Sequence, residues 1–121
     1  MMEHELSAFY DITHGVGLAI LTPRWMRYVL NDLTVDKFAE YAVNVWNMDA
    51  SEDMYKLANE GINATENFFK SLNIPMYLRE LNITEEYFDI MAEHAVKYGM
   101  LGYAYVPLNK EDVKSIFKMC M

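Results

Sequence analysis

Apolar side chains recur at every third or fourth position along most of this chain, and no stretch shows the alternation typical of a half-buried strand. The segment 35–46 is the clearest case, because Thr34 precedes it as a candidate N-cap and its apolar residues share one helical face. The residues on that face are Val35, Phe38, Ala39, Ala42, Val45 and Trp46. The pattern predicts an all-α fold.

Boundary residues predict where the later helices begin and end. A long helix over 54–72 has Ser51 as a candidate cap and is closed by Ile74-Pro75, because the residue before a proline avoids the helical region. Gly61 is expected to weaken the middle of this helix, since glycine has a low helix propensity.

The last third of the chain contains two further helical segments. Thr84 opens the first, over 84–98, and Gly99 is expected to follow its end as a C′ residue. Asn109 is expected to cap a final short helix. The segment between them, 101–108, is the one extended-looking stretch.

The first thirty residues indicate a helix, a break and a second helix that contains Pro23. Two β-branched residues, Ile12 and Thr13, followed by Gly15, predict the break near 11–15. With the segments above, the chain should form a bundle of about six helices. No repeat or linker divides it, so residues 1–121 are expected to form one domain.

Composition narrows the possible partners. The chain has 10 Lys and Arg against 18 Asp and Glu, and a net charge of −8 repels nucleic acid and anionic lipid. No apolar run approaches the ~20 residues that span a bilayer, and no signal peptide opens the chain. The lone cysteine, Cys120, cannot form an internal disulfide. We therefore expect a cytoplasmic protein that binds neither nucleic acid nor membrane.

Two of the three histidines, His4 and His14, lie close together in the sequence and raise the question of a metal site. In one continuous helix they would be roughly 15 Å apart and unable to share an ion. The predicted break permits a shared site without requiring one. His14 would then begin the second helix, where the helix dipole favours the neutral ring that binds metals.

Other residues add little to this hypothesis. The nearby carboxylates of Glu3, Glu5 and Asp11 could supply oxygen ligands, but near a helix start such groups are more often dipole partners or solvated. His94 is expected to be structural. The chain has no GxGxxG, GxxxxGK[ST], GxSxG or CxxC motif, so it carries no recognisable nucleotide loop or nucleophile.

Longer stretches of the chain resemble a known family. They are HELSAFYDITHGVGLAILTPRWMRYVLND (4–32), KFAEYAVNVWN (37–47), TENFFKSLNIP (65–75) and YVPLNKEDVKSIFKMC (105–120). Together they resemble the iron-containing alcohol dehydrogenases, most closely the NAD(P)H-dependent butanol dehydrogenase branch. Family members have an N-terminal α/β nucleotide-binding domain and a C-terminal helical domain, and this chain resembles the helical domain alone.

The resemblance implies roles for both N-terminal histidines. The family binds its divalent metal, iron or sometimes zinc, through a D-x-x-x-H pair, the first histidine of H-x-x-x-H, and the histidine of an HG pair. His14 falls on the HG histidine and is the implied metal ligand. His4 falls on the second histidine of H-x-x-x-H, beside nicotinamide and substrate, and is the implied catalytic residue. The remaining ligands would precede Met1, so the isolated chain is expected to bind neither metal nor NAD(P)H.

Two hypotheses about function follow. In the first, the chain is the helical portion of an alcohol dehydrogenase that transfers hydride between NAD(P)H and a primary alcohol or aldehyde such as butanol or butanal. It would be inactive until a complementary chain supplies the nucleotide-binding domain. In the second, it is a non-catalytic helical module that binds a protein partner. Either way, an uncovered apolar cleft surface would favour self-association.

Overall fold

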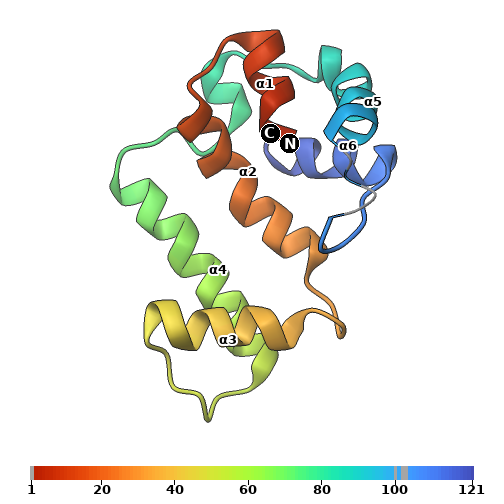
Figure 1. Ribbon diagram of the computed structural model, residues 1–121. Helices are drawn as coiled ribbons and strands as arrows, with labels where there is room; N and C mark the ends of the chain where they lie inside the picture. The colour runs from red at the N-terminus through yellow and green to blue at the C-terminus, as the bar shows by residue number, and fades with distance from the viewer. Residues whose placement is uncertain (1, 100, 102–103) are drawn as a thin grey trace.

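Helices account for most of the chain, as the hydrophobic periodicity predicts (Figure 1). The computed structural model describes residues 2–99, 101 and 104–121, and in this part it contains six α-helices, two short 3-10 helices and no strand. The elements are α1 (Met2–Tyr10), α2 (His14–Val29), α3 (Val35–Trp46), α4 (Met54–Ser71), η1 (Leu78–Leu81), η2 (Glu85–Tyr87), α5 (Phe88–Gly99) and α6 (Lys110–Met119). The predicted all-α class is confirmed.

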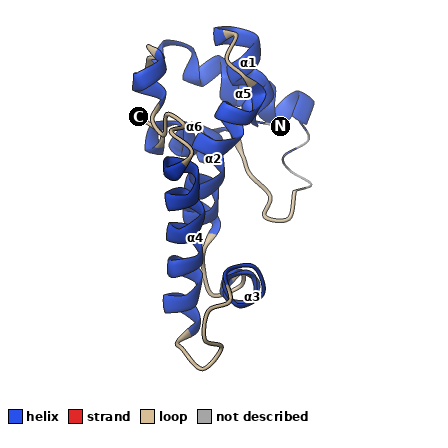
Figure 2. Ribbon diagram, turned by 90° about the vertical axis from the view of Figure 1, so that its left-hand side faces the viewer, coloured by secondary structure: helices blue, strands red, loops and turns tan. Residues whose placement is uncertain are grey.

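The helices form a body and an arm, which Figures 1 and 2 show from two sides. In the body, α1 and α6 pack against both α2 and α5, and the Phe88 and Phe117 rings stack across α5 and α6 with centroids 5.4 Å apart. In the arm, α3 packs against α4 over a small separate core of Ala39, Ala42 and Leu57. Among the described residues, none of the helices has the length and apolar character that a membrane span requires.

Two of the expected N-caps differ from the structure. Thr34 does precede α3, but its hydroxyl donates to the Val29 carbonyl at 2.8 Å and does not cap the helix. This bond fastens the turn between α2 and α3 instead. Ser51 is not the cap of α4, because the carboxylate of Asp53 accepts a bond from the Lys56 N–H at 3.1 Å.

Of the helix boundaries expected in the last third of the chain, the start of α6 is confirmed and the end of α5 is not. Asn109 caps α6 in a full capping box with Asp112, in which each side chain accepts the other residue's N–H at 2.9 Å. Gly99 is the last residue of α5 rather than a left-handed C′ residue, so that prediction is wrong. The extended stretch expected at 101–108 falls partly outside the described residues, and 104–106 form bends.

Gly61 has a packing role that helix propensity does not reveal. A Cβ atom placed on Gly61 would lie 2.9 Å from the Cβ of Ala42 on α3. This is closer than two carbon atoms can approach without movement of a helix. The glycine therefore permits α3 and α4 to pack closely in the arm.

We predict that Gly61→Ala lowers the free energy of unfolding by about 1–3 kcal/mol, because overpacking outweighs the gain in helix propensity. Urea unfolding followed by circular dichroism measures this. Gly15→Ala is the matched control, since a Cβ there has nothing within 4 Å. Equal stability of the two variants would contradict the close packing.

Burial of the C-terminal cysteine gives a chemical prediction. Cys120 is 0% exposed, and burial raises the pKa of its thiol to about 12. Because an unfolded thiol has a pKa of about 8.5, iodoacetamide at about pH 8 should label unfolded chains quickly and folded chains very slowly. Mass spectrometry with and without urea measures the two rates. Rapid labelling of the folded chain would contradict the burial.

The same burial predicts that the free energy of unfolding falls as pH rises above about 8.5, because only the thiol of the unfolded chain ionises there.

Candidate metal and substrate site

The site begins at the break between α1 and α2. Residues 11–13 are not helical, and Asp11 adopts a left-handed backbone with φ of 51°, which aspartate tolerates better than most residues. The Asp11 N–H bonds to the Ser7 carbonyl at 2.9 Å and closes the last turn of α1. The chain then reverses, so that α1 and α2 pack against each other. The predicted break is confirmed.

This reversal brings the two N-terminal histidines together. The ring centroids of His4 and His14 are 5.8 Å apart, with the planes at 85° in an edge-to-face arrangement. Both rings lie at the surface, and the His14 side chain is 60% exposed. Residues that one helix would separate by about 15 Å are therefore neighbours.

A third residue of α1, Glu3, completes the cluster and corrects an expectation. Glu3 is 1% exposed and is neither a solvated group nor a simple partner of the helix dipole. One carboxylate oxygen contacts Nδ1 of His14, and the other accepts a hydrogen bond from the Ser7 hydroxyl at 2.5 Å. The missing Cβ of Gly17 leaves room for the Glu3 side chain, but a glycine in the sequence does not show which side chain will fill that room.

The other candidate residues lie elsewhere. Glu5 points to α5, where its carboxylate is 3.5 Å from Nδ1 of His94. The His94 ring also packs near the rings of Phe9 and Tyr98, with centroids 6.1 and 5.6 Å away. These contacts fit the structural role expected of His94.

The cluster is not a metal site by itself. Across residues 2–99, 101 and 104–121, no group of three or more His, Cys, Asp or Glu side chains is arranged to hold an ion. Nδ1 of His14 is engaged by Glu3, which leaves Nε2 as the ring nitrogen available to a metal ion. A divalent ion at this nitrogen would need further ligands, since catalytic sites normally have at least three protein ligands.

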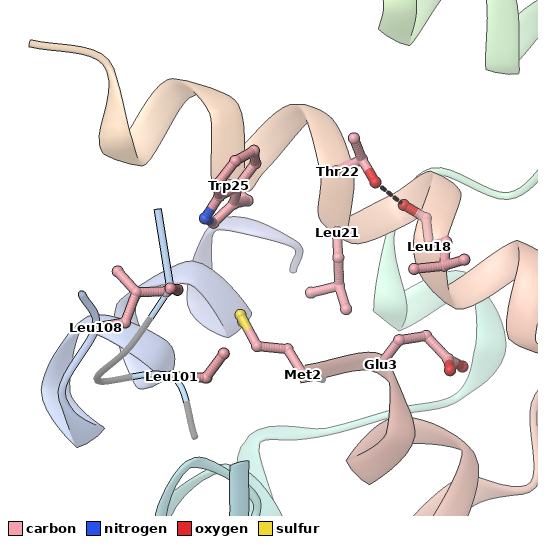
Figure 3. A pocket seen from close by; sticks show the side chains of 9 residues that line it. Met2, Glu3, Leu18, Leu21, Thr22, Trp25, Leu101 and Leu108 are labelled. Carbon is pink, nitrogen blue, oxygen red and sulfur yellow. Dashed lines mark hydrogen bonds between the residues drawn. The ribbon is translucent and has the colours of Figure 1, made fainter. Parts of the chain in front are cut away.

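An apolar cavity of about 270 Å³ lies on another side of Glu3, between the start of α1, α2 and the segment before α6 (Figure 3). Its lining is formed by Met2, Glu3, Leu18, Leu21, Thr22, Trp25, Leu101, Ala104 and Leu108. The Thr22 hydroxyl donates to the Leu18 carbonyl at 2.6 Å, so its proton is not available to a ligand. Sequence reasoning missed this cavity because its residues follow the same periodicity as core residues.

Comparison with known proteins shows a match along the whole chain. Residues 1–121 match the Fe-containing alcohol dehydrogenase family, C-terminal. NADH-dependent butanol dehydrogenase A of Clostridium acetobutylicum is 54% identical over 119 residues, which cover 97% of this chain and 30% of that protein. Probable NADH-dependent butanol dehydrogenase 2 of Bacillus subtilis is 41% identical over 121 residues, with the same coverage of 97% and 30%.

Solved structures share the fold. A 1,3-propanediol oxidoreductase superposes with a TM-score of 0.85 at 31% identity, over 99% of this chain and 31% of that one. NADH-dependent butanol dehydrogenase A of Thermotoga maritima gives a TM-score of 0.81 at 31% identity, over 98% and 31%. The chain thus spans about 30% of the length of the relatives it matches. It belongs to the Fe-containing alcohol dehydrogenase family and corresponds to the C-terminal, helical portion of its members.

Proposed function

We propose that this chain is the helical portion of an iron-type alcohol dehydrogenase that transfers hydride between NAD(P)H and a primary alcohol or aldehyde such as butanol or butanal. The observation that carries the proposal is the pairing of His4 and His14, with ring centroids 5.8 Å apart. Similarity to relatives named NADH-dependent butanol dehydrogenases supports the substrate class and the nucleotide.

In this proposal His14 is a metal ligand through Nε2. An imidazole nitrogen suits iron or zinc, and the exposed ring leaves room for an ion and its other ligands. An aspartate and further histidines would come from residues outside this sequence. Because a single imidazole cannot hold a catalytic ion, the isolated chain is expected to be inactive.

The chain's own residues would bind and orient the substrate. When bound, the ion polarises the substrate oxygen and the nicotinamide carries the hydride. His4, next to His14, is placed to hydrogen-bond the alcohol oxygen and to hold its proton. The nucleotide-binding part, in the same polypeptide or in a complementary chain, is the implied partner.

A chimera tests the proposal. This chain replaces the matching 30% of the 54% identical Clostridium acetobutylicum protein, and butanal-dependent NADH oxidation is measured with added Fe²⁺ or Zn²⁺. We expect turnover. His14→Ala should lower metal affinity by at least about 100-fold, because losing a metal ligand costs more affinity than losing a residue that supports a ligand. His4→Asn should keep the metal and lower kcat by about 10²–10⁴-fold.

His94→Asn is the control, because His94 contacts Glu5 on the other side of α1 and should change neither metal affinity nor kcat. Unchanged metal affinity in His14→Ala would overturn the ligand assignment. A folded chimera that binds NADH but shows no turnover with either metal would favour the non-catalytic module that binds a protein partner. Sedimentation of the isolated chain would then measure its self-association.

A further inference from the structure

Glu3 is a buried carboxylate whose two oxygens are both occupied by side chains. Its residue exposure is 1%, and its partners are Nδ1 of His14 and the Ser7 hydroxyl. Burial of a carboxylate is costly unless hydrogen bonds replace its water. Here the two contacts do so, which fixes the carboxylate rather than leaving it free to move.

Ser7 on α1 and Gly17 on α2 define the space that this carboxylate occupies. The Ser7 hydroxyl on α1 lies 2.5 Å from Glu3 and 3.2 Å from the carbonyl of Ile12 in the break. On α2, a Cβ at Gly17 would lie 2.5 Å from both Cγ and Oε1 of Glu3. The Glu3 side chain thus fills space beside α2 that the Cβ of any other residue at position 17 would occupy.

His14 needs such support because its own packing is weak. Its side chain is 60% exposed, so few neighbours restrict rotation of the ring. An acceptor at Nδ1 selects the form of neutral imidazole that carries its proton on Nδ1 and leaves Nε2 with a free lone pair. Metal-binding histidines commonly donate their other ring N–H to a carboxylate, which fixes the ring and makes the nitrogen more basic.

We propose that Glu3 is a positioning residue for His14: it holds the Nδ1 proton and directs Nε2 toward a divalent metal ion, with Ser7 and Gly17 holding Glu3. This rests on the proposed role of His14 as a ligand. A role for Glu3 as a direct ligand is disfavoured, because both oxygens already have partners and the residue is buried.

A matched pair on the same helix provides the control. Glu5 and His94 form a second carboxylate–histidine contact, at 3.5 Å, between α1 and α5. Substitution of either glutamate removes the same chemical group from the same helix. A general effect of lost charge on α1 would alter both histidines, whereas the proposal requires Glu3 to affect His14 alone.

The first experiment reads the ring protons directly in the 121-residue chain. With ¹⁵N-labelled histidine at about pH 8, above the ordinary imidazole pKa of about 6.5, two-bond ¹H–¹⁵N spectra identify which nitrogen is protonated. The chain has three histidines, which simplifies assignment. We expect His14 to carry its proton on Nδ1. Glu3→Met should shift it to Nε2, and Glu3→Gln, which keeps an acceptor oxygen, should restore part of the effect.

Gly17→Ala should also move the His14 proton to Nε2, because the added Cβ displaces Glu3 without removing its carboxylate. This variant serves as the test if circular dichroism shows that Glu3→Met does not fold. Glu5→Met should alter the signals of His94 and leave those of His14 unchanged. A proton on Nε2 of His14 in the unmodified chain, or signals indifferent to every change at position 3, would overturn the proposal.

The second experiment measures affinity for Zn²⁺ and Co²⁺ by chelator competition in the chimera. Glu3→Met should weaken binding by about 10–100-fold, Glu3→Gln by less, and Glu5→Met not at all. If His14→Ala leaves affinity unchanged, the ligand assignment fails whatever the spectra show. If His14→Ala weakens binding and Glu3→Met does not, the positioning role fails and the proposed function stands.

Discussion

The close approach of α1 to α2 is the constraint on which the site depends. It requires the left-handed turn at Asp11, which reverses the chain, and the missing side chain at Gly17, which admits the Glu3 carboxylate between the helices. Without the reversal, the two N-terminal histidines would lie roughly 15 Å apart along one helix. Without the glycine, the carboxylate could not reach Nδ1 of His14 from a buried position.

The body and the arm meet different physical demands. The body buries large side chains such as Phe88, Phe117 and Ile20, and it fixes α2 from several sides. The arm consists of two helices. The small side chains in its core of Ala39, Ala42 and Leu57 let these helices pack closely. The histidine pair and the cavity both belong to the body, where packing is more extensive.

Local signals in the sequence were sufficient for the presence of the α-helices in the described residues and for the break before His14. The start of one helix differs, because Thr84 caps the short 3-10 helix η2 and α5 begins only at Phe88. Asn109 could be identified as a cap because a capping box depends only on residues three positions apart. The burial of Glu3, the use of the Thr34 hydroxyl in a turn, and the contact between Gly61 and Ala42 could not be predicted in this way. Each depends on which helices come together, and a period of three or four residues does not specify that. The proposed roles of His4 and His14 came from resemblance to a family, and spacing alone left them open.

The last residues of the chain have a consequence for the timing of assembly. The Cys120 sulfur lies 3.9 Å from the Ile20 carbonyl on α2, although 100 positions separate them, and the Cys120 carbonyl accepts the Leu78 N–H at 2.8 Å. Contacts so distant in sequence form late, because a long loop must close first. The packing around α2 is therefore complete only once residue 120 has folded back onto it.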